Sequence, residues 1–106
     1  MDKKTALEIA KRYSKIVSKE FPVRRVILFG SHAKGEERSN SDIDIAVIIE
    51  KLEGDFLEAQ IKLFKLRRSI DLRIEPVLIE ETEDKTGFLR EVLNSGIEVY
   101  SKETIP

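Results

Sequence analysis

The stretch that decides the fold is Gly30–Ile49, which reads GSHAKGEERSNSDIDIAVII and directly follows the apolar run Val26–Phe29. An apolar run that ends in Gly-Ser predicts a strand followed by a tight turn. Side chains two positions apart on a strand point the same way. We therefore expect Asp42 and Asp44 to share one face of a second strand, while Ile43 and its alternate neighbours face a core.

These residue types suit the binding of a cation and a phosphate. Two neighbouring carboxylates repel each other unless a cation lies between them. Oxygen ligands of this kind suit Mg²⁺, which is commonly shared with substrate phosphates. Gly30 lacks a Cβ, so its backbone can approach a phosphate closely, and Ser31 adds a hydroxyl and an N–H.

Gly-Ser, a short spacer and Asp-x-Asp at the start of a strand form the signature of a known superfamily. The stretch resembles the nucleotidyltransferase superfamily typified by DNA polymerase beta and, more narrowly, the minimal nucleotidyltransferase (MNT) family of bacteria and archaea. The resemblance covers roughly Leu7 to Tyr100. It implies an α/β fold, with a small mixed twisted sheet flanked by helices and an active site on its open edge.

The resemblance also implies roles for the motif residues. Gly30 and Ser31 would hold the β- and γ-phosphates of a nucleoside triphosphate, and Asp42 and Asp44 would hold Mg²⁺ against them. In the family a third carboxylate from a neighbouring strand completes the metal site and helps to activate the attacking hydroxyl.

We expect the third strand over Ile70–Glu75, stopped by Pro76, with Asp71, Arg73 and Glu75 on one face and Leu72 and Ile74 on the other. The family pattern maps the third carboxylate to Asp71, and Glu75 is the alternative. Arg73 either contacts a phosphate or pairs with its acidic neighbours.

Other residues near the motif have simpler interpretations. His32 is the only histidine, and we expect it to be a turn residue rather than a catalyst. Lys34 and Arg38 are expected to be solvated, with contact to the triphosphate as the alternative. Neither a P-loop nor a G-x-G-x-x-G fingerprint is present in the sequence.

Length and composition point to one domain, residues 1–106. With 19 basic and 20 acidic residues, the chain lacks the basic excess of a dedicated nucleic-acid binder, and we expect no nucleic-acid template. It has no cysteine, and therefore neither a disulfide nor a thiolate metal site. The absence of a long apolar run and of a secretory pattern predicts a cytoplasmic protein without a membrane partner.

The hydrophobic periodicity predicts alternating helices and strands, ending in a short strand. The helix that follows Gly54 and ends near Ser69 has more apolar positions than a narrow core-facing stripe requires. It either packs between the sheet and another helix or leaves one apolar edge for another subunit, so a homo-oligomer is possible. The expected segments are helix 2–20, strand 23–29, turn 30–41 with a possible short helix, strand 42–49, helix 54–69, strand 70–75, an apolar continuation 77–79, charged loop 80–85, helix 88–93 and strand 97–100.

The resemblance, together with the apolar excess of the helix after Gly54, leads to three expected functions. We expect a Mg²⁺-dependent nucleotidyltransferase that moves a nucleotide, AMP from ATP by preference, to a hydroxyl on a partner, as the MNT antitoxin of a HEPN/MNT toxin–antitoxin pair. The first alternative is a catalytically weak binding protein that neutralises its partner by docking. The second is a small-molecule adenylyltransferase, although the enzymes of that kind carry an added domain for the acceptor.

Overall fold

The computed structural model describes residues 2–35, 42–83 and 86–102. Within them, four strands form one sheet in the order β3-β2-β1-β4. β2 pairs with β3 in parallel, and β1 pairs with both β2 and β4 in antiparallel fashion. The expected mixed sheet with flanking helices is therefore confirmed. The elements are α1 (Lys3–Glu20), β1 (Val23–Phe29), α2 (Ser31–Lys34), β2 (Ile43–Ile49), α3 (Phe56–Leu66), β3 (Ile74–Glu80), α4 (Phe88–Ser95) and β4 (Ile97–Ser101), with short 3₁₀ turns at Arg67–Ser69 and Glu81–Glu83.

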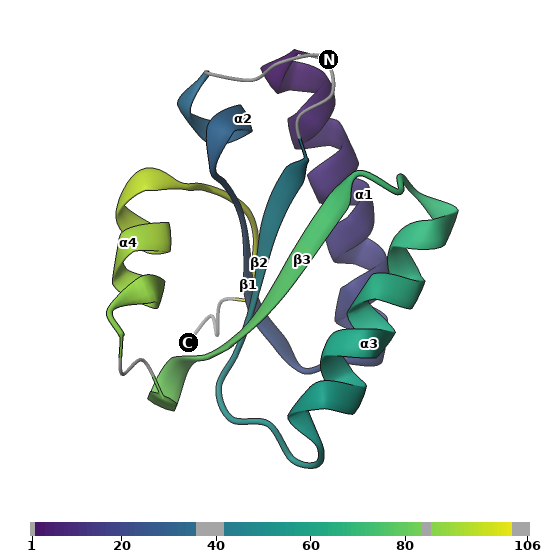
Figure 1. The fold of residues 1–106 in the computed structure, drawn as a ribbon, viewed down its shortest axis with the longest axis vertical. Coiled ribbons are helices and arrows are strands. Elements are labelled where there is room, and N and C mark those ends of the chain that lie inside the picture. Colours follow the sequence, from purple (N-terminus) through teal and green to yellow (C-terminus); the bar gives the residue numbers. More distant parts are fainter. Residues whose placement is uncertain (1, 36–41, 84–85, 103–106) are drawn as a thin grey trace.

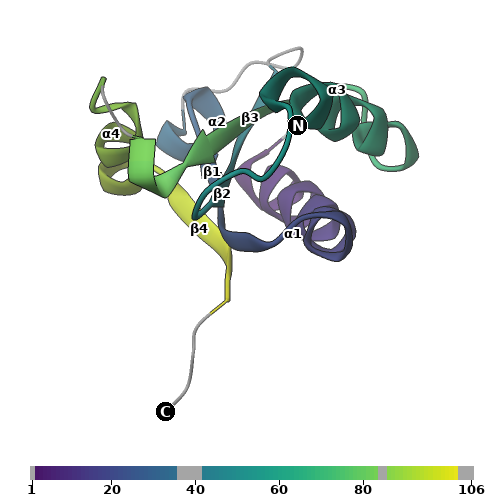
Figure 2. The same ribbon diagram turned by 90° about the horizontal axis from the view of Figure 1, so that it is seen from below.

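Helices cover the two faces of the sheet unequally. α1 and α3 lie on one face and α4 lies on the other (Figure 1), and the view from below shows the same arrangement (Figure 2). The larger core lies beneath α1 and α3 and takes alternate residues of β2, such as Ile43 and Ile45. The residues between them on β2 face α4, where Ala46 and Ile48 belong to a smaller core.

α1 follows its predicted pattern closely. Asp2 caps its N-terminus by accepting a hydrogen bond from the backbone N–H of Thr5 at 2.8 Å. Its apolar stripe is buried, and the buried hydroxyl of Tyr13 donates to the carbonyl of Leu63 on α3 at 2.7 Å. This bond ties the two helices together over the larger core.

The third strand differs from its prediction. β3 begins at Ile74 and runs through Pro76 to Glu80, so the expected strand over Ile70–Glu75 is wrong. β3 is an edge strand, and Gln60 of α3 bonds to the outward-facing carbonyl of Pro76 and N–H of Leu78. At this position a backbone N–H would also point to the open edge, away from β2. The missing N–H of Pro76 therefore removes no hydrogen bond between strands, and β3 continues through it.

Smaller differences lie at the ends of elements. β2 begins at Ile43 rather than at Asp42. α3 ends at Leu66, and a 3₁₀ turn replaces its expected last residues. Leu72, expected inside a strand, is 66% exposed in the turn before β3. No helix in the described part of the chain combines the length and the apolar character needed to cross a membrane.

Candidate active site

The Gly-Ser turn is built against the carboxylate of Asp44. Gly30 ends β1 with φ 73° and ψ −151°, a conformation that is essentially restricted to glycine. A Cβ at this position would overlap Oδ2 of Asp44. Ser31 then begins α2, and Gly35 ends that helix in the left-handed conformation. The motif therefore requires glycine at position 30 for two reasons, the backbone conformation and the space that Asp44 occupies.

Asp44 lies in a row of side chains that crosses the sheet. Phe29 of β1 and Glu75 of β3 are its partners in register on either side. All three point to the face that α4 covers only in part, because their neighbours Leu28, Ile43 and Ile74 belong to the opposite core. Phe29 packs edge-on against Phe88 of α4, with ring centroids 5.7 Å apart.

The electrostatics of Asp44 favour a bound cation. Burial raises the pKa of its carboxyl group, and the negative charges of Asp42 and then Glu75 raise it further. The nearby His32 acts in the opposite direction. Negative charges that destabilise one another without a cation become ligands when one binds.

Asp71 has a different environment. It lies in the turn before β3, and its carboxylate accepts three hydrogen bonds from Arg73, from Nε at 3.0 Å, Nη2 at 2.7 Å and the backbone N–H at 2.8 Å. These bonds, led by those of the side chain, hold the pKa of Asp71 below its ordinary value. Of the two interpretations of Arg73, the structure has the pairing with an acidic neighbour. The expected alternation of Asp71 with Glu75 along one strand is wrong, because only Glu75 lies on β3.

The donor set fits a metal that is shared with a substrate. Asp42 is exposed just before β2, Asp44 is half-buried within it, and the Glu75 side chain is 41% exposed. Among the residues that the structure describes, no three acidic or histidine side chains come close enough together to hold an ion. Carboxylates on one face, with Gly30 and Ser31 beside them, fit Mg²⁺ that takes its remaining ligands from phosphates.

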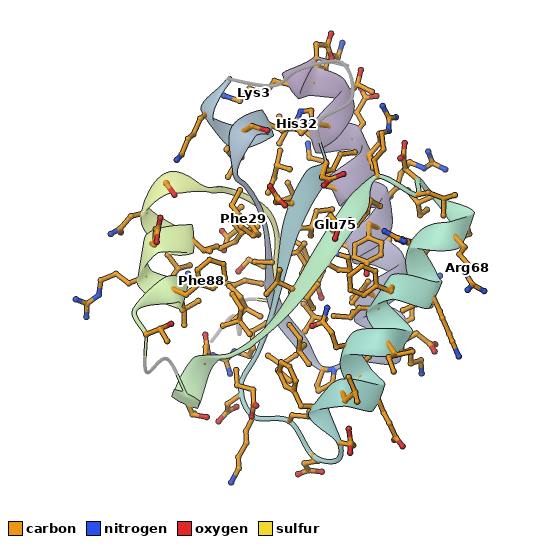
Figure 3. All side chains as sticks on the ribbon, viewed as in Figure 1. Lys3, Phe29, His32, Arg68, Glu75 and Phe88 are labelled. Atoms are coloured by element: carbon orange, nitrogen blue, oxygen red, sulfur yellow. The ribbon has the colours of Figure 1, made fainter. Side chains whose placement is uncertain are left out.

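The histidine beside the motif lies inside the protein, close enough to Asp44 to act on its charge. His32 is fully buried in α2, at the same end of the sheet as Glu75 (Figure 3). The sequence predicts a turn residue at this position, and the only signal of a closer link to the site is that His32 directly follows the motif serine. Phe29 was also missed, although its place in register with Asp44 follows from a strand that ends at Gly30. Lys34 is exposed, and Arg38 lies outside the described residues.

This fold and site define a nucleotidyltransferase domain of the polymerase beta type. The family model for polymerase beta nucleotidyltransferases matches residues 11–105. The chain therefore belongs to the polymerase beta nucleotidyltransferase family, as its motif predicted.

Individual relatives give a narrower comparison. The chain is 35% identical over 99 residues to a protein from Methanocaldococcus jannaschii named as a protein adenylyltransferase, and the match covers 88% of this chain and 97% of the relative. A toxin–antitoxin crystal structure with AMP-PNP has a similar chain, with a TM-score of 0.67 and 25% identity over 88% of this chain and 74% of that one. The fold is also similar to a chain in the complex of the tri-AMPylated HEPN toxin of Shewanella oneidensis with an MNT antitoxin, with a TM-score of 0.62 and 20% identity over 94% of this chain and 73% of that one.

Proposed function

We propose that this protein transfers AMP from ATP to a hydroxyl on a partner protein, in a reaction that depends on Mg²⁺. The observation that carries the proposal is the contact between the two halves of the motif, where Gly30 is turned against the carboxylate of Asp44 while Glu75 lies beside Asp44 in register. A phosphate-binding turn and a pair of carboxylates on one open face are what nucleotidyl transfer requires.

Each site residue has a separate role in this proposal. Gly30 and Ser31 would hold the β- and γ-phosphates, and Asp42, Asp44 and Glu75 would hold Mg²⁺. The metal, when bound, neutralises phosphate charge and polarises the phosphorus under attack. The acceptor oxygen forms a bond to the α-phosphorus, the bond from that phosphorus to the bridging oxygen breaks, and pyrophosphate leaves. Glu75 would accept the proton of the attacking hydroxyl.

We assign the third carboxylate to Glu75 rather than to Asp71. Glu75 is the register partner of Asp44 and raises its pKa, whereas Asp71 is fully engaged with Arg73. A carboxylate already neutralised by a bidentate arginine is a poor ligand for a second cation.

For the partner we propose a HEPN-type toxin, with this chain as its MNT antitoxin. Support comes from the relative named as a protein adenylyltransferase and from the structural neighbours in toxin–antitoxin complexes, one of which holds AMP-PNP. In this assignment ATP is the substrate and Mg²⁺ the cofactor, and the reaction takes place in the cytoplasm.

The test is a transfer assay with ATP labelled at the α-phosphate, Mg²⁺ and the product of the adjacent gene. A labelled protein band that the double variant Asp42→Asn/Asp44→Asn does not produce would establish the transfer, and mass spectrometry of the band would locate the acceptor. Absence of label with ATP, GTP, CTP and UTP, from a folded protein with its partner present, would contradict the proposal.

A second function is favoured by one surface feature. Phe56, Leu57 and Ile61 of α3 are 47%, 66% and 45% exposed, so part of the apolar excess of this helix is not used in the core. A protein that neutralises its toxin by docking alone would need such a surface. Toxin inhibition that survives Asp42→Asn/Asp44→Asn without ATP would establish this function.

A further inference from the structure

The open edge of β3 is held by side chains from α3 and the turn after it. Gln60 Nε2 donates to the carbonyl of Pro76 at 2.7 Å, and the N–H of Leu78 donates to Gln60 Oε1 at 3.0 Å. Nη1 of Arg67 donates to the carbonyl of Ile74 at 2.9 Å. An edge strand normally leaves these groups to water, so here the beginning of β3 is fixed in place by two side chains.

Arg67 also makes contact with the residue after Ile74. The same Nη1 atom lies 3.8 Å from Oε1 of Glu75. α3 packs on one face of the sheet and Glu75 points to the other, so Arg67 reaches around the strand edge between the two faces. One guanidinium group therefore touches both the backbone that precedes Glu75 and the carboxylate of Glu75 itself.

The position of Arg67 is itself restrained. Its guanidinium carbon lies 4.9 Å from the centroid of the Phe64 ring, within the range of a cation–π contact. Only 24% of its side chain is exposed, and its charge acts on the buried phenol of Tyr13. Arg68, the next residue, extends outward from the end of α3 (Figure 3) and is exposed.

We propose that Arg67 is a positioning residue for the metal-binding carboxylate of Glu75. It anchors the start of β3 through Ile74 and gives Glu75 a positive partner on the side away from Asp44. Two neighbouring carboxylates would otherwise push apart before a metal arrives. The contact of 3.8 Å between partly exposed groups is weak enough to yield when a divalent cation binds. The inference rests on the proposed function, in which Glu75 is the third carboxylate.

The test measures metal binding directly. Mn²⁺ replaces Mg²⁺, AMP-PNP supplies the triphosphate, and electron paramagnetic resonance reports free Mn²⁺. Arg67→Met removes the charge and the donors but keeps an apolar chain beside Phe64, and Arg68→Met is its matched control with the same change in charge. We expect Arg67→Met to weaken Mn²⁺ binding about 10-fold, the usual size of such an indirect effect, and Arg68→Met to change it less than about twofold.

A double-mutant cycle separates positioning from general stability. If Arg67 acts through Glu75, then Arg67→Met adds less than about twofold to the loss already present in Glu75→Gln. An equal loss in both backgrounds, or Arg67→Met behaving like Arg68→Met, overturns the inference. If Glu75→Gln alone binds Mn²⁺ like the unmodified protein, the assignment of Glu75 itself has failed, and the Arg67 inference fails with it. If Arg67→Met binds Mn²⁺ normally while Glu75→Gln binds it weakly, only the inference about Arg67 fails.

A second pair of variants covers the case in which Arg67→Met melts below the assay temperature. Arg67→Lys keeps the charge but lacks the planar guanidinium group that contacts the carbonyl of Ile74 and the carboxylate of Glu75 at the same time. We expect it to bind Mn²⁺ roughly threefold more weakly than Arg68→Lys. Equal binding by these two lysine variants overturns the inference.

Discussion

Two carboxylates lie on either side of the start of β3, and their surroundings are opposite. Asp71, in the turn before the strand, is held by three hydrogen bonds from Arg73, and its pKa is lowered. Glu75, on the strand, faces Asp44 and raises the pKa of that residue. Asp71 already has a close counter-charge, whereas Glu75 has a weaker contact with Arg67 at 3.8 Å and adds to the negative charge around Asp44. An acidic residue binds a cation more readily where its existing positive partner is held loosely.

The largest test of this comparison is catalytic. We expect Glu75→Gln to lower the rate of AMP transfer by roughly 10²–10³-fold, because an electrostatic group at the reacting phosphate is lost. Asp71→Asn should lower it less than about 10-fold, since its carboxylate only orders a turn. Initial rates with ATP labelled at the α-phosphate measure both. A reversed order of the two variants would restore the assignment to Asp71.

The turn that meets Asp44 gives the next largest effect. Gly30→Ala adds a Cβ where Asp44 lies, in a backbone conformation that costs an alanine about 1–3 kcal/mol. Gly35→Ala is the matched control, because Gly35 also has a positive φ, yet a Cβ there meets nothing within 4 Å. We expect Gly30→Ala to lower transfer by roughly 10²-fold and Gly35→Ala to cost only the stability expected of a left-handed alanine, about 1–2 kcal/mol. Similar transfer rates for both variants would mean that contact with Asp44 is unimportant.

The two parts of the candidate site differ in how far the sequence alone could place them. Gly30, Ser31, Asp42 and Asp44 lie within one short stretch of sequence. The glycine turn meets Asp44 on β2, while Asp42 lies just before that strand. The partner of Asp44 on β3 depends on the register between two strands that α3 separates in sequence. No local pattern encodes that register.

The third strand was misplaced because a general rule about proline was applied without its exception. Proline interrupts a central strand because it lacks a backbone N–H. β3 lies at the edge of the sheet, however, and Gln60 hydrogen-bonds the outward-facing carbonyl of Pro76, so the strand continues through the proline. The alternation of Asp71, Arg73 and Glu75 is also typical of a strand. In the structure, however, Arg73 donates hydrogen bonds to the carboxylate of Asp71, and the two residues form a turn. The predictions for the long helices and the first two strands, and for the final helix, were confirmed to within a few residues at their ends.

The comparison also makes a prediction about stability without ligand. Burial and the charges of Asp42 and Glu75 raise the pKa of Asp44, so its ionised form opposes folding. Asp44→Asn should therefore raise Tm at pH 7 by roughly 2–5 °C, the change that somewhat less than about 1 kcal/mol produces in a domain of this size. A group with a raised folded pKa favours folding below its unfolded pKa and loses that contribution as pH rises, so the advantage of the variant should disappear near pH 3. Calorimetry at both pH values, without divalent cations, measures it, and a lower Tm at pH 7 would contradict it.

The smallest expected effect is that of Asp71→Asn on stability, and its sign is opposite to that of Asp44→Asn. The bonds from Arg73 lower the pKa of Asp71, so this group stabilises the fold above its unfolded pKa and loses that contribution as pH falls through the lower, folded pKa. The Arg73 side chain is 42% exposed, so solvent screens the pair and keeps its contribution to stability small. Asp71→Asn should therefore destabilise the protein slightly at pH 7, and the difference from the unmodified chain should fade toward pH 2. If urea unfolding at pH 7 showed Asp71→Asn to be stabilising, as Asp44→Asn is expected to be, the two carboxylates would not differ in the way that their surroundings indicate.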